Sequence, residues 1–247
     1  MEDDKNLSRR AFVRLCVGTG AAVTTNPKLL ANTPAPLRPT ESVALVTQSG
    51  TPIRAGDLSP GETYVFNYPY VSTPCFLIEL GRPTETVSGL ETEDGRRYSW
   101  KGGVGPERSV VAFSAICAHR MSYPTKDISF ISYRHEEVRF TDLDRKSARK
   151  EQVIYCCSEG SVYDPAEGGR VLGGPAPQPL AAVDLTCSED GAISACGTYG
   201  GDMFDRFFEG FGFQLSLIHG TAGFREPASE TSVVVPLEEY TRNQRTC

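Results

Sequence analysis

Two short segments of the chain carry thiol and imidazole side chains at a spacing suited to a metal centre. The first, CAHRM, places Cys117 two residues before His119. The second, CCSEGSVYDP, opens with the adjacent pair Cys156 and Cys157, carries Glu159 and contains no histidine. Thiolates and neutral imidazoles are the ligands that bind iron–sulfur clusters and other transition-metal centres. The two segments therefore predict a metal site whose last ligand is in question.

Together with a third string, GGRVLGGPAPQPL, these segments resemble the Rieske iron–sulfur protein family. That family has a first loop C-x-H, a second loop C-x-x-H-G-S-x-Y/F-D and a proline-rich third loop, G-P-A-P. The resemblance spans roughly residues 55–200 and is nearest the arsenite oxidase small-subunit branch. It implies an all-β fold of Rieske-type stacked antiparallel sheets, a cluster-binding subdomain over about residues 111–180, and a [2Fe–2S] cofactor.

The resemblance also implies roles for single residues. Family members hold the cluster with two thiolates on one iron and two imidazoles on the other. Cys117 and His119 of the first loop match one ligand of each kind. Ser161 matches the serine that bonds a bridging sulfide, and Tyr163 matches the tyrosine that bonds a cysteine sulfur. Such hydrogen-bond donors tune the potential of a cluster.

The second histidine is missing in either register of the second loop. Anchored on the G-S-x-Y-D string, the loop reads Cys156-x-x-Glu159, whereas the register of some long-spacer relatives reads Cys157-x-x-Gly160. We slightly favour Cys157 as the ligand, and a site that uses both cysteines is a third arrangement. Glu159 is an oxygen donor that binds ferric iron and would lower the potential relative to imidazole.

Two further departures accompany the missing histidine. The positions of the family's inter-loop disulfide hold Ser122 and Ser158, so the resemblance implies that this bond is absent. The two loops are separated by a 36-residue connection, residues 120–155, in which KDISFISYRHEEVRF predicts an extra strand pair and DLDRKSARKEQ a solvated turn. His135 lies in this insertion and is a weak alternative ligand, because its surroundings are typical of an exposed edge strand.

Short apolar runs between turn formers predict an antiparallel β-domain over residues 40–247. Four of these runs are SVALVT, TYVFNYPY, CFLIEL and SVVAFSAI. An amphipathic helix is expected in the C-terminal extension, about residues 200–247, and its aromatic residues are interpreted as core. These aromatic residues are Phe204, Phe207, Phe208 and Phe211.

Three cysteines outside the loops bear on the redox chemistry. LAAVDLTCSEDGAISACG predicts a hairpin that carries Cys187 and Cys196 on its arms, either as a disulfide or as two unpaired small residues. Cys247 at the terminus is expected to be free.

The N-terminal segment, residues 1–36, contains the string SRRAF, which matches the twin-arginine export pattern S-R-R-x-F. We therefore expect export to the periplasm and removal of this segment near residues 31–36. An anchor retained in the inner membrane and an ordinary amphipathic helix are the alternatives. The net charge of −6, without a basic stripe, argues against nucleic acid as a partner.

These observations favour a one-electron carrier in a periplasmic redox chain, working as a small subunit or soluble partner of a larger oxidoreductase and not as a stand-alone catalyst. Its expected partner is a molybdenum or cytochrome subunit or a c-type cytochrome. Without the second histidine, we expect no quinol oxidation by the family's route. The alternative is a cluster-less Rieske-fold subunit that serves assembly or partner binding.

Overall fold

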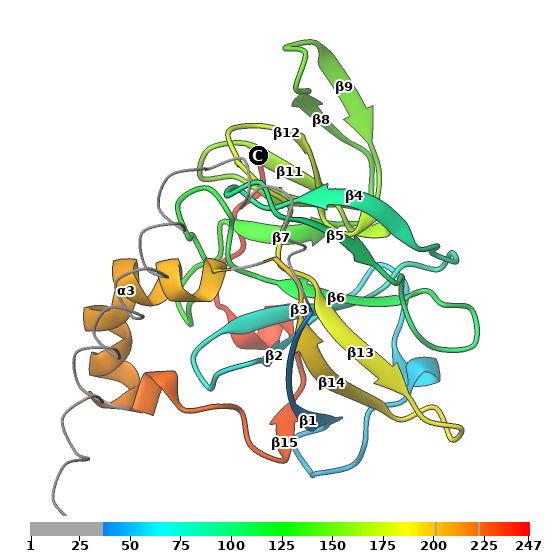
Figure 1. Ribbon diagram of the computed structural model, residues 1–247, viewed down its shortest axis with the longest axis vertical. Coiled ribbons are helices and arrows are strands. Elements are labelled where there is room, and N and C mark those ends of the chain that lie inside the picture. Colours follow the sequence, from blue (N-terminus) through cyan, green and yellow to red (C-terminus); the bar gives the residue numbers. More distant parts are fainter. Residues whose placement is uncertain (1–36, 201, 222) are drawn as a thin grey trace, which may run out of the picture.

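The computed structural model describes residues 37–200, 202–221 and 223–247 (Figure 1). The predicted export segment, residues 1–36, lies outside the described residues. The strands are β1 (Arg38–Val46), β2 (Thr63–Asn67), β3 (Pro74–Glu79), β4 (Val87–Glu91), β5 (Arg97–Trp100), β6 (Val110–Ser114), β7 (Ile131–Arg134), β8 (Val138–Thr141), β9 (Ser147–Lys150), β10 (Val153–Cys156), β11 (Ser161–Asp164), β12 (Arg170–Gly173), β13 (Val183–Cys187), β14 (Ile193–Thr198), β15 (Thr231–Val233) and β16 (Val235–Pro236). The helices are η1 (Ala55–Asp57), η2 (Pro165–Glu167), α3 (Met203–His219), η3 (Gly223–Arg225) and α4 (Leu237–Tyr240).

Two four-stranded sheets form the base of the domain. Their strand orders are β13-β14-β1-β15 and β16-β2-β3-β6, and every pairing is antiparallel except that of β1 with β15. Strand β3 shows why the two sheets stack. Cys75 and Leu77 pack against the β1 sheet, whereas Phe76 and Ile78 face the opposite way. Since successive side chains of a strand point to opposite faces, the sheet that contains β3, β16-β2-β3-β6, is buried on both sides. It is the central sheet of the domain.

A third sheet, of order β12-β11-β10-β7, lies over the free face of the central sheet and carries the second and third of the predicted metal-binding loops (Figure 1). Its inward side chains, among them Ile131, Ile154 and Tyr163, share one core with Phe76 and Ile78 of β3. The predicted all-β fold of stacked antiparallel sheets is confirmed, and its loop-bearing subdomain shares the core of the central sheet.

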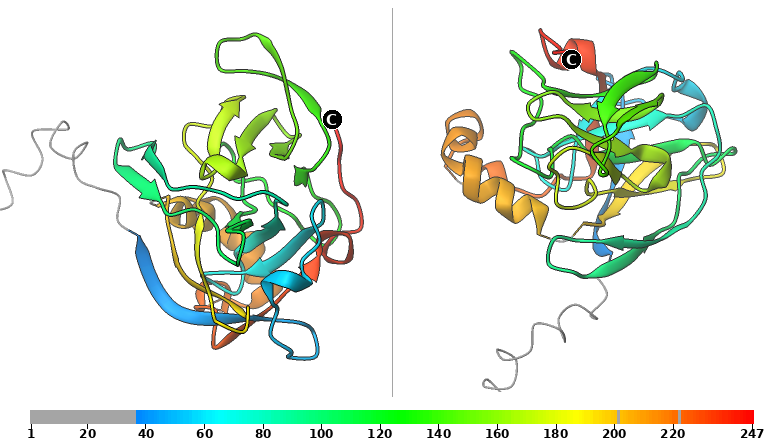
Figure 2. Two further views of the ribbon diagram at one scale, coloured as in Figure 1. Left: turned by 90° about the vertical axis from the view of Figure 1, so that its right-hand side faces the viewer. Right: turned by 90° about the horizontal axis from the view of Figure 1, so that it is seen from above.

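The insertion between the loops is organised differently from the prediction. Strand β7 pairs with β10, whereas β8 pairs with β9 in a separate hairpin that projects from the top of the molecule (Figures 1 and 2). The expected strand pair within KDISFISYRHEEVRF is therefore wrong, because β7 and β8 belong to different sheets. The charged stretch DLDRKSARKEQ contains the hairpin turn but also strand β9, so it is not a turn alone. Phe140, Val153 and Val162 form a small core that joins this hairpin to the third sheet.

Helix α3 packs its aromatic face on the side of the loop-bearing subdomain. The ring of Tyr123 lies 4.9 Å from that of Phe207 and 5.3 Å from that of Phe211. Phe204 and Phe208 are also buried, which confirms that these aromatics serve the core. The helix therefore supports the chain that leaves the first loop. No helix in the described part of the chain combines the length and the apolar character needed to cross a membrane.

Candidate metal centre

The first loop, residues 117–121, is a tight turn that follows β6. The backbone N–H of Met121 donates to the carbonyl of Cys117 at 2.9 Å, and the N–H of Cys117 donates to the carbonyl of Ser122 at 2.8 Å. Met121 adopts φ of 58° and buries its side chain in the core. This turn directs Cys117 into the protein and leaves His119 half-buried near the surface.

The second loop, residues 156–164, joins β10 to β11. Cys156 ends β10 opposite Ser161, and the N–H of Gly160 donates to the carbonyl of Cys156 at 2.9 Å. The third loop, residues 174–177, presses on this turn at Gly174, which has φ of 80°. A Cβ atom at Gly174 would lie 2.3 Å from the carbonyl oxygen of Gly160, so only glycine allows the two loops to approach this closely.

Cys117 and Cys156 form a pair of buried thiols, one from each loop. They are 2% and 1% exposed, and both are free. The hydrogen bond from the Cys156 thiol lowers the pKa of Cys117 to about 6, helped by Tyr163 and the backbone N–H of His119 and opposed by burial. The same hydrogen bond, together with burial, raises the pKa of Cys156. One of the two sulfurs is therefore poised as a thiolate, the form that binds metals.

Tyr163 and Ser161 supply hydroxyl groups beside this thiol pair. The Tyr163 hydroxyl accepts the N–H of Ala118 at 3.1 Å and lies 3.2 Å from Cys117 Sγ. When Cys117 is a thiolate, only the tyrosine carries a proton, so the Tyr163 hydroxyl then donates to the sulfur and helps to lower the pKa of Cys117. The Ser161 hydroxyl is buried, adds slightly to lowering the pKa of Cys117, and makes no well-formed hydrogen bond to another described residue. An unpaired buried donor beside two thiols suits an inorganic sulfide acceptor.

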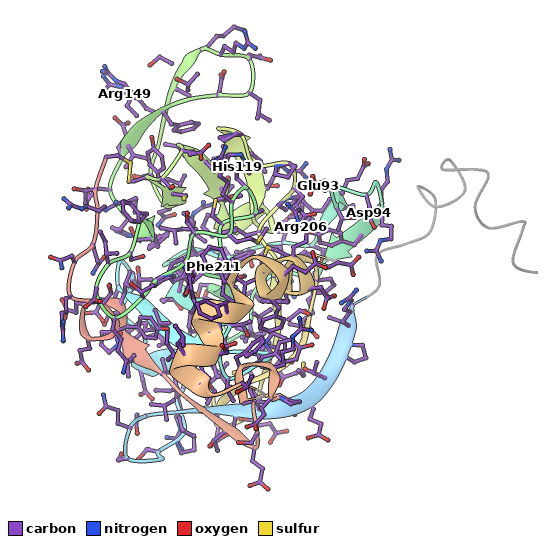
Figure 3. The ribbon with its side chains drawn as sticks, turned by 90° about the vertical axis from the view of Figure 1, so that its left-hand side faces the viewer. Glu93, Asp94, His119, Arg149, Arg206 and Phe211 are labelled. Atoms are coloured by element: carbon purple, nitrogen blue, oxygen red, sulfur yellow. A yellow bond between two sulfur atoms is a disulfide. The ribbon has the colours of Figure 1, made fainter. Side chains whose placement is uncertain are left out.

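His119 and Glu159 face each other at the outer edge of the site. Nδ1 of His119 lies 3.2 Å from Oε2 of Glu159, and Nε of Arg120 lies 3.0 Å from Oε1 of the same carboxylate. Figure 3 shows His119 between the β8–β9 hairpin, which carries Arg149, and helix α3, which carries Phe211. The structure thus places a carboxylate beside the imidazole of the first loop. Arg120 is a contact that the sequence pattern alone did not single out.

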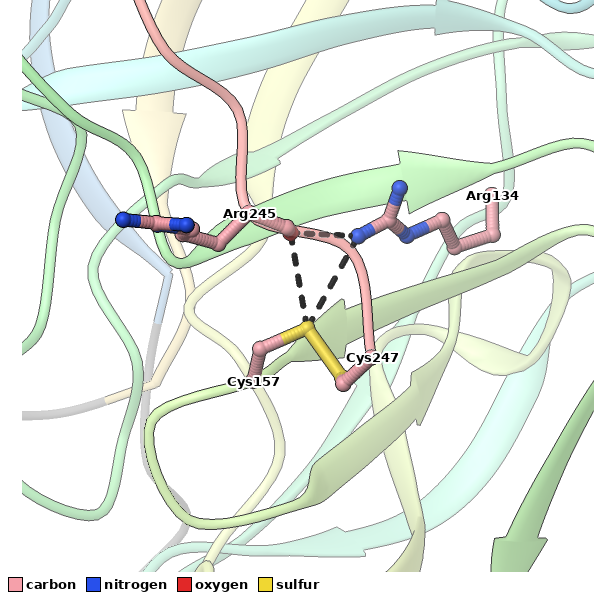
Figure 4. The surroundings of a disulfide bond; sticks show 4 residues. All are labelled: Arg134, Cys157, Arg245 and Cys247. Carbon is pink, nitrogen blue, oxygen red and sulfur yellow. Dashed lines mark hydrogen bonds between the residues drawn. A yellow bond between two sulfur atoms is a disulfide. The ribbon is translucent and has the colours of Figure 1, made fainter.

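Cys157 points away from this site and forms a disulfide with Cys247, with a Cα–Cα distance of 5.7 Å (Figure 4). The preference for Cys157 as the ligand is therefore corrected to Cys156, which is the thiol beside Cys117. A site that uses both cysteines is likewise not what the structure shows. The expectation that Cys247 is free is wrong. The sequence did carry one indication of this arrangement. Side chains alternate along a strand, so only one of two adjacent cysteines can point into the site.

The remaining candidates lie elsewhere. Cys187 and Cys196 are both free, because Cys187 pairs with Ile193 across the hairpin and Cys196 lies at a register shift. His135 packs against Gly61 and Tyr133, and no described contact links it to the loops. Across the described residues, no three His, Cys, Asp or Glu side chains converge closely enough to hold a single metal ion.

A surface recess of about 520 Å³ opens beside the site. It lies between the second loop, the third loop and the turn of the β8–β9 hairpin. Its lining includes Tyr155, Glu159, Gly160, Pro175 and Leu143. The Leu143 side chain is 64% exposed. The recess gives another molecule access to the carboxylate edge of the site.

The chain was compared with known proteins. No protein-family model matches it. Among solved structures, the soluble domain of the Rieske protein II from Sulfolobus acidocaldarius is 30% identical, with a TM-score of 0.41. The match covers 57% of this chain and 71% of that one. The chain is thus similar to a Rieske protein over more than half of its length.

Proposed function

We propose that this protein is a Rieske-type [2Fe–2S] electron-transfer protein. Cys117 and Cys156 would hold one iron, and His119 and Glu159 would hold the other. The observation that carries this proposal is the buried thiol pair, with the Tyr163 hydroxyl 3.2 Å from Cys117 Sγ. When bound, such a cluster supplies reversible one-electron transfer.

The protein residues set the properties of this centre. A carboxylate in place of an imidazole adds negative charge beside the iron and lowers the reduction potential. Arg120 lies 3.0 Å from Glu159 and offsets part of that charge. The side chains of His119 and Glu159 are 23% and 37% exposed, so this edge of the site is open to a partner.

We place this function in a periplasmic redox chain, as a small subunit or soluble partner of a larger oxidoreductase. The twin-arginine pattern before Phe12 and the Cys157–Cys247 disulfide support an oxidising compartment outside the cytoplasm. A molybdenum or cytochrome subunit or a c-type cytochrome is the expected redox partner. Without a second imidazole to bind and deprotonate quinol, the centre passes electrons between proteins and does not oxidise quinol by the family's route.

Iron and sulfide analysis with EPR of the reduced, exported protein tests the proposal. We expect two iron atoms and two sulfides per chain and a rhombic spectrum that differs from that of a two-histidine centre. Glu159→His should move the spectrum and the potential toward two-histidine values. Glu189→His, a change on the exposed β13–β14 turn, is the matched control and should leave both unchanged. Absence of iron with the assembly and export machinery intact would contradict the proposal.

A second candidate is a cluster-less subunit that keeps the fold for partner binding. It is favoured by one observation, namely that His119 and Arg120 both already contact the Glu159 carboxylate. The same iron analysis separates the two candidates, because this form would bind its partner with no iron and no change on Glu159→His.

A further inference from the structure

The C-terminal tail, residues 241–247, is laid against the segment that leaves the first loop. The N–H of Arg242 donates to the carbonyl of Lys126 at 3.0 Å, and the N–H of Ser129 donates to the carbonyl of Asn243 at 2.8 Å. The N–H of Arg245 donates to the carbonyl of Ser129 at 2.8 Å. The tail therefore runs alongside residues 126–129, with one parallel β-bridge between Ser129 and Gln244, and its end reaches the second loop.

At that end, several contacts converge on Cys157. Its sulfur is bonded to Cys247, and its N–H donates to the carbonyl of Phe130 at 2.7 Å. The guanidinium of Arg134 on β7 donates to the carbonyl of Arg245 at 2.7 Å and lies 3.7 Å from Cys157 Sγ (Figure 4). Cys157 is thus held by the tail, by the segment before β7 and by β7 itself.

Away from the tail, the exposed part of the second loop is contacted through the Glu159 carboxylate, by His119 and Arg120. Ser158 and Glu159 are exposed, and a Cβ atom at Gly160 would meet nothing within 4 Å. Cys156, in contrast, is buried as the last residue of β10. The hydrogen bond of the Cys157 N–H to Phe130 continues the pairing of β10 with β7 beyond Cys156, so an outward Cys157 goes with a Cys156 thiol that points inward.

We propose that Cys247 and the C-terminal tail are the positioning device of the second loop, and that the Cys157–Cys247 disulfide is needed to hold Cys156 beside Cys117. This inference rests on the proposed function only in that the positioned thiol is taken to be a cluster ligand. The bond is open to reagents, since Cys247 is exposed and Cys157 half-buried. A dithiol reductant opens it by giving two electrons and two protons to the two sulfurs, and is itself oxidised to a disulfide.

Hydrogen exchange of the full chain provides a test that does not require a cluster. The N–H groups of Cys157 and Gly160 report on the loop, because each has a backbone acceptor in the intact structure. In Cys247→Ser we expect both amides to exchange at least tenfold faster than in untreated wild-type protein. We expect the same increase in wild-type protein after treatment with a dithiol. Amides of β3 should be unaffected in both cases. Cys187→Ser, which removes a free cysteine from the other end of the domain, is the matched control and should behave as wild type.

The outcome that would overturn the proposal is unchanged exchange at Cys157 and Gly160 in both Cys247→Ser and reduced wild-type protein. It would equally be overturned if mass spectrometry found Cys157 and Cys247 as thiols in the exported protein. Cys157→Ser provides a second variant and should match Cys247→Ser if the tail acts through the bond.

Iron content distinguishes this proposal from the proposed function. If wild-type protein holds a cluster, Cys247→Ser should lose its EPR signal at least tenfold faster on incubation, and Cys187→Ser should not. If wild-type protein holds no iron, the function proposed above fails, while the exchange rates at Cys157 and Gly160 still decide the role of the tail.

Discussion

At the scale of single residues, the two hydroxyls beside the thiol pair differ in one respect. The Tyr163 hydroxyl has two protein partners, Ala118 and Cys117, whereas the Ser161 hydroxyl has no well-formed hydrogen bond among the described residues. Tyr163 thus acts in the protein with or without a cluster. The Ser161 hydroxyl therefore remains available to an acceptor that the protein does not itself provide.

Tyr163→Phe should lower the reduction potential by about 40 to 90 mV, the one-electron equivalent of a hydrogen bond worth about 1 to 2 kcal/mol. The reason is that the tyrosine donor stabilises the more negative, reduced centre through Cys117. An EPR-monitored redox titration measures the shift. Tyr133→Phe removes a buried hydroxyl that has no described partner and should leave the potential where it was.

Ser161→Ala should leave the stability of the iron-free protein within about 0.5 kcal/mol of wild type, because no hydrogen bond within the protein is lost. Ser114→Ala is the comparison, since its buried hydroxyl accepts the N–H of Ile116 at 3.1 Å. That change should cost about 1 to 3 kcal/mol. Urea denaturation of both variants measures the difference, and equal losses would show that Ser161 has a partner in the protein itself.

At the scale of elements, the site depends on the close backbone contact between the third loop and the second loop. Gly174 makes this contact through its backbone, against the carbonyl of Gly160. The β10–β11 hairpin supplies Cys156 and Ser161 in one register pair, so a shift of this turn would displace both together. The third loop therefore packs closely on the turn of the second loop at Gly160.

Gly174→Ala should destabilise the protein by more than 2 kcal/mol, about twice the cost of positive-φ strain alone. A matched control is Gly50→Ala, which has φ of 82° but open space around its Cβ position. It should cost only about 1 kcal/mol. Chemical denaturation compares the two variants, and similar losses would mean that the close approach of the loops contributes nothing.

At the scale of the whole molecule, one covalent bond joins the chain terminus to the middle of the sequence. The Cys157–Cys247 disulfide spans 90 residues, including the third loop, strands β11 to β16 and helix α3. A loop of that length removes much of the conformational freedom of the unfolded chain. The bond therefore stabilises the entire domain as well as ordering the second loop.

Reduction of this disulfide should lower the free energy of unfolding by about 4 to 5 kcal/mol on the chain-entropy estimate for such a loop. Denaturation of wild-type protein with and without a phosphine reductant measures the change. Cys247→Ser should have the lower stability from the outset and show no further response to the reductant. A loss of equal size in Cys247→Ser on reduction would place the effect at another pair of cysteines.

Much of the fold and part of the site could be predicted from local sequence patterns. Alternating apolar runs between turn formers led to antiparallel strands, because that period depends on neighbouring residues alone. The resemblance of the first loop and of the Ser161–Tyr163 string to the Rieske loops led to the Tyr163 contact with Cys117, because each string is a local motif. The inserted segment was harder to predict, since β7 and β8 both look like strands and only their partners, β10 and β9, assign them to different sheets.

The sequence by itself determined the side chains available to the two loops: thiols, one imidazole and the carboxylate of Glu159. Only the tertiary structure decided which of the adjacent cysteines, Cys156 or Cys157, joins Cys117. The physical reason is that side-chain direction at the end of β10 depends on its register with β7 and β11, and that the partner of Cys157 comes from 90 residues away. Local sequence specifies neither the register nor the distant partner.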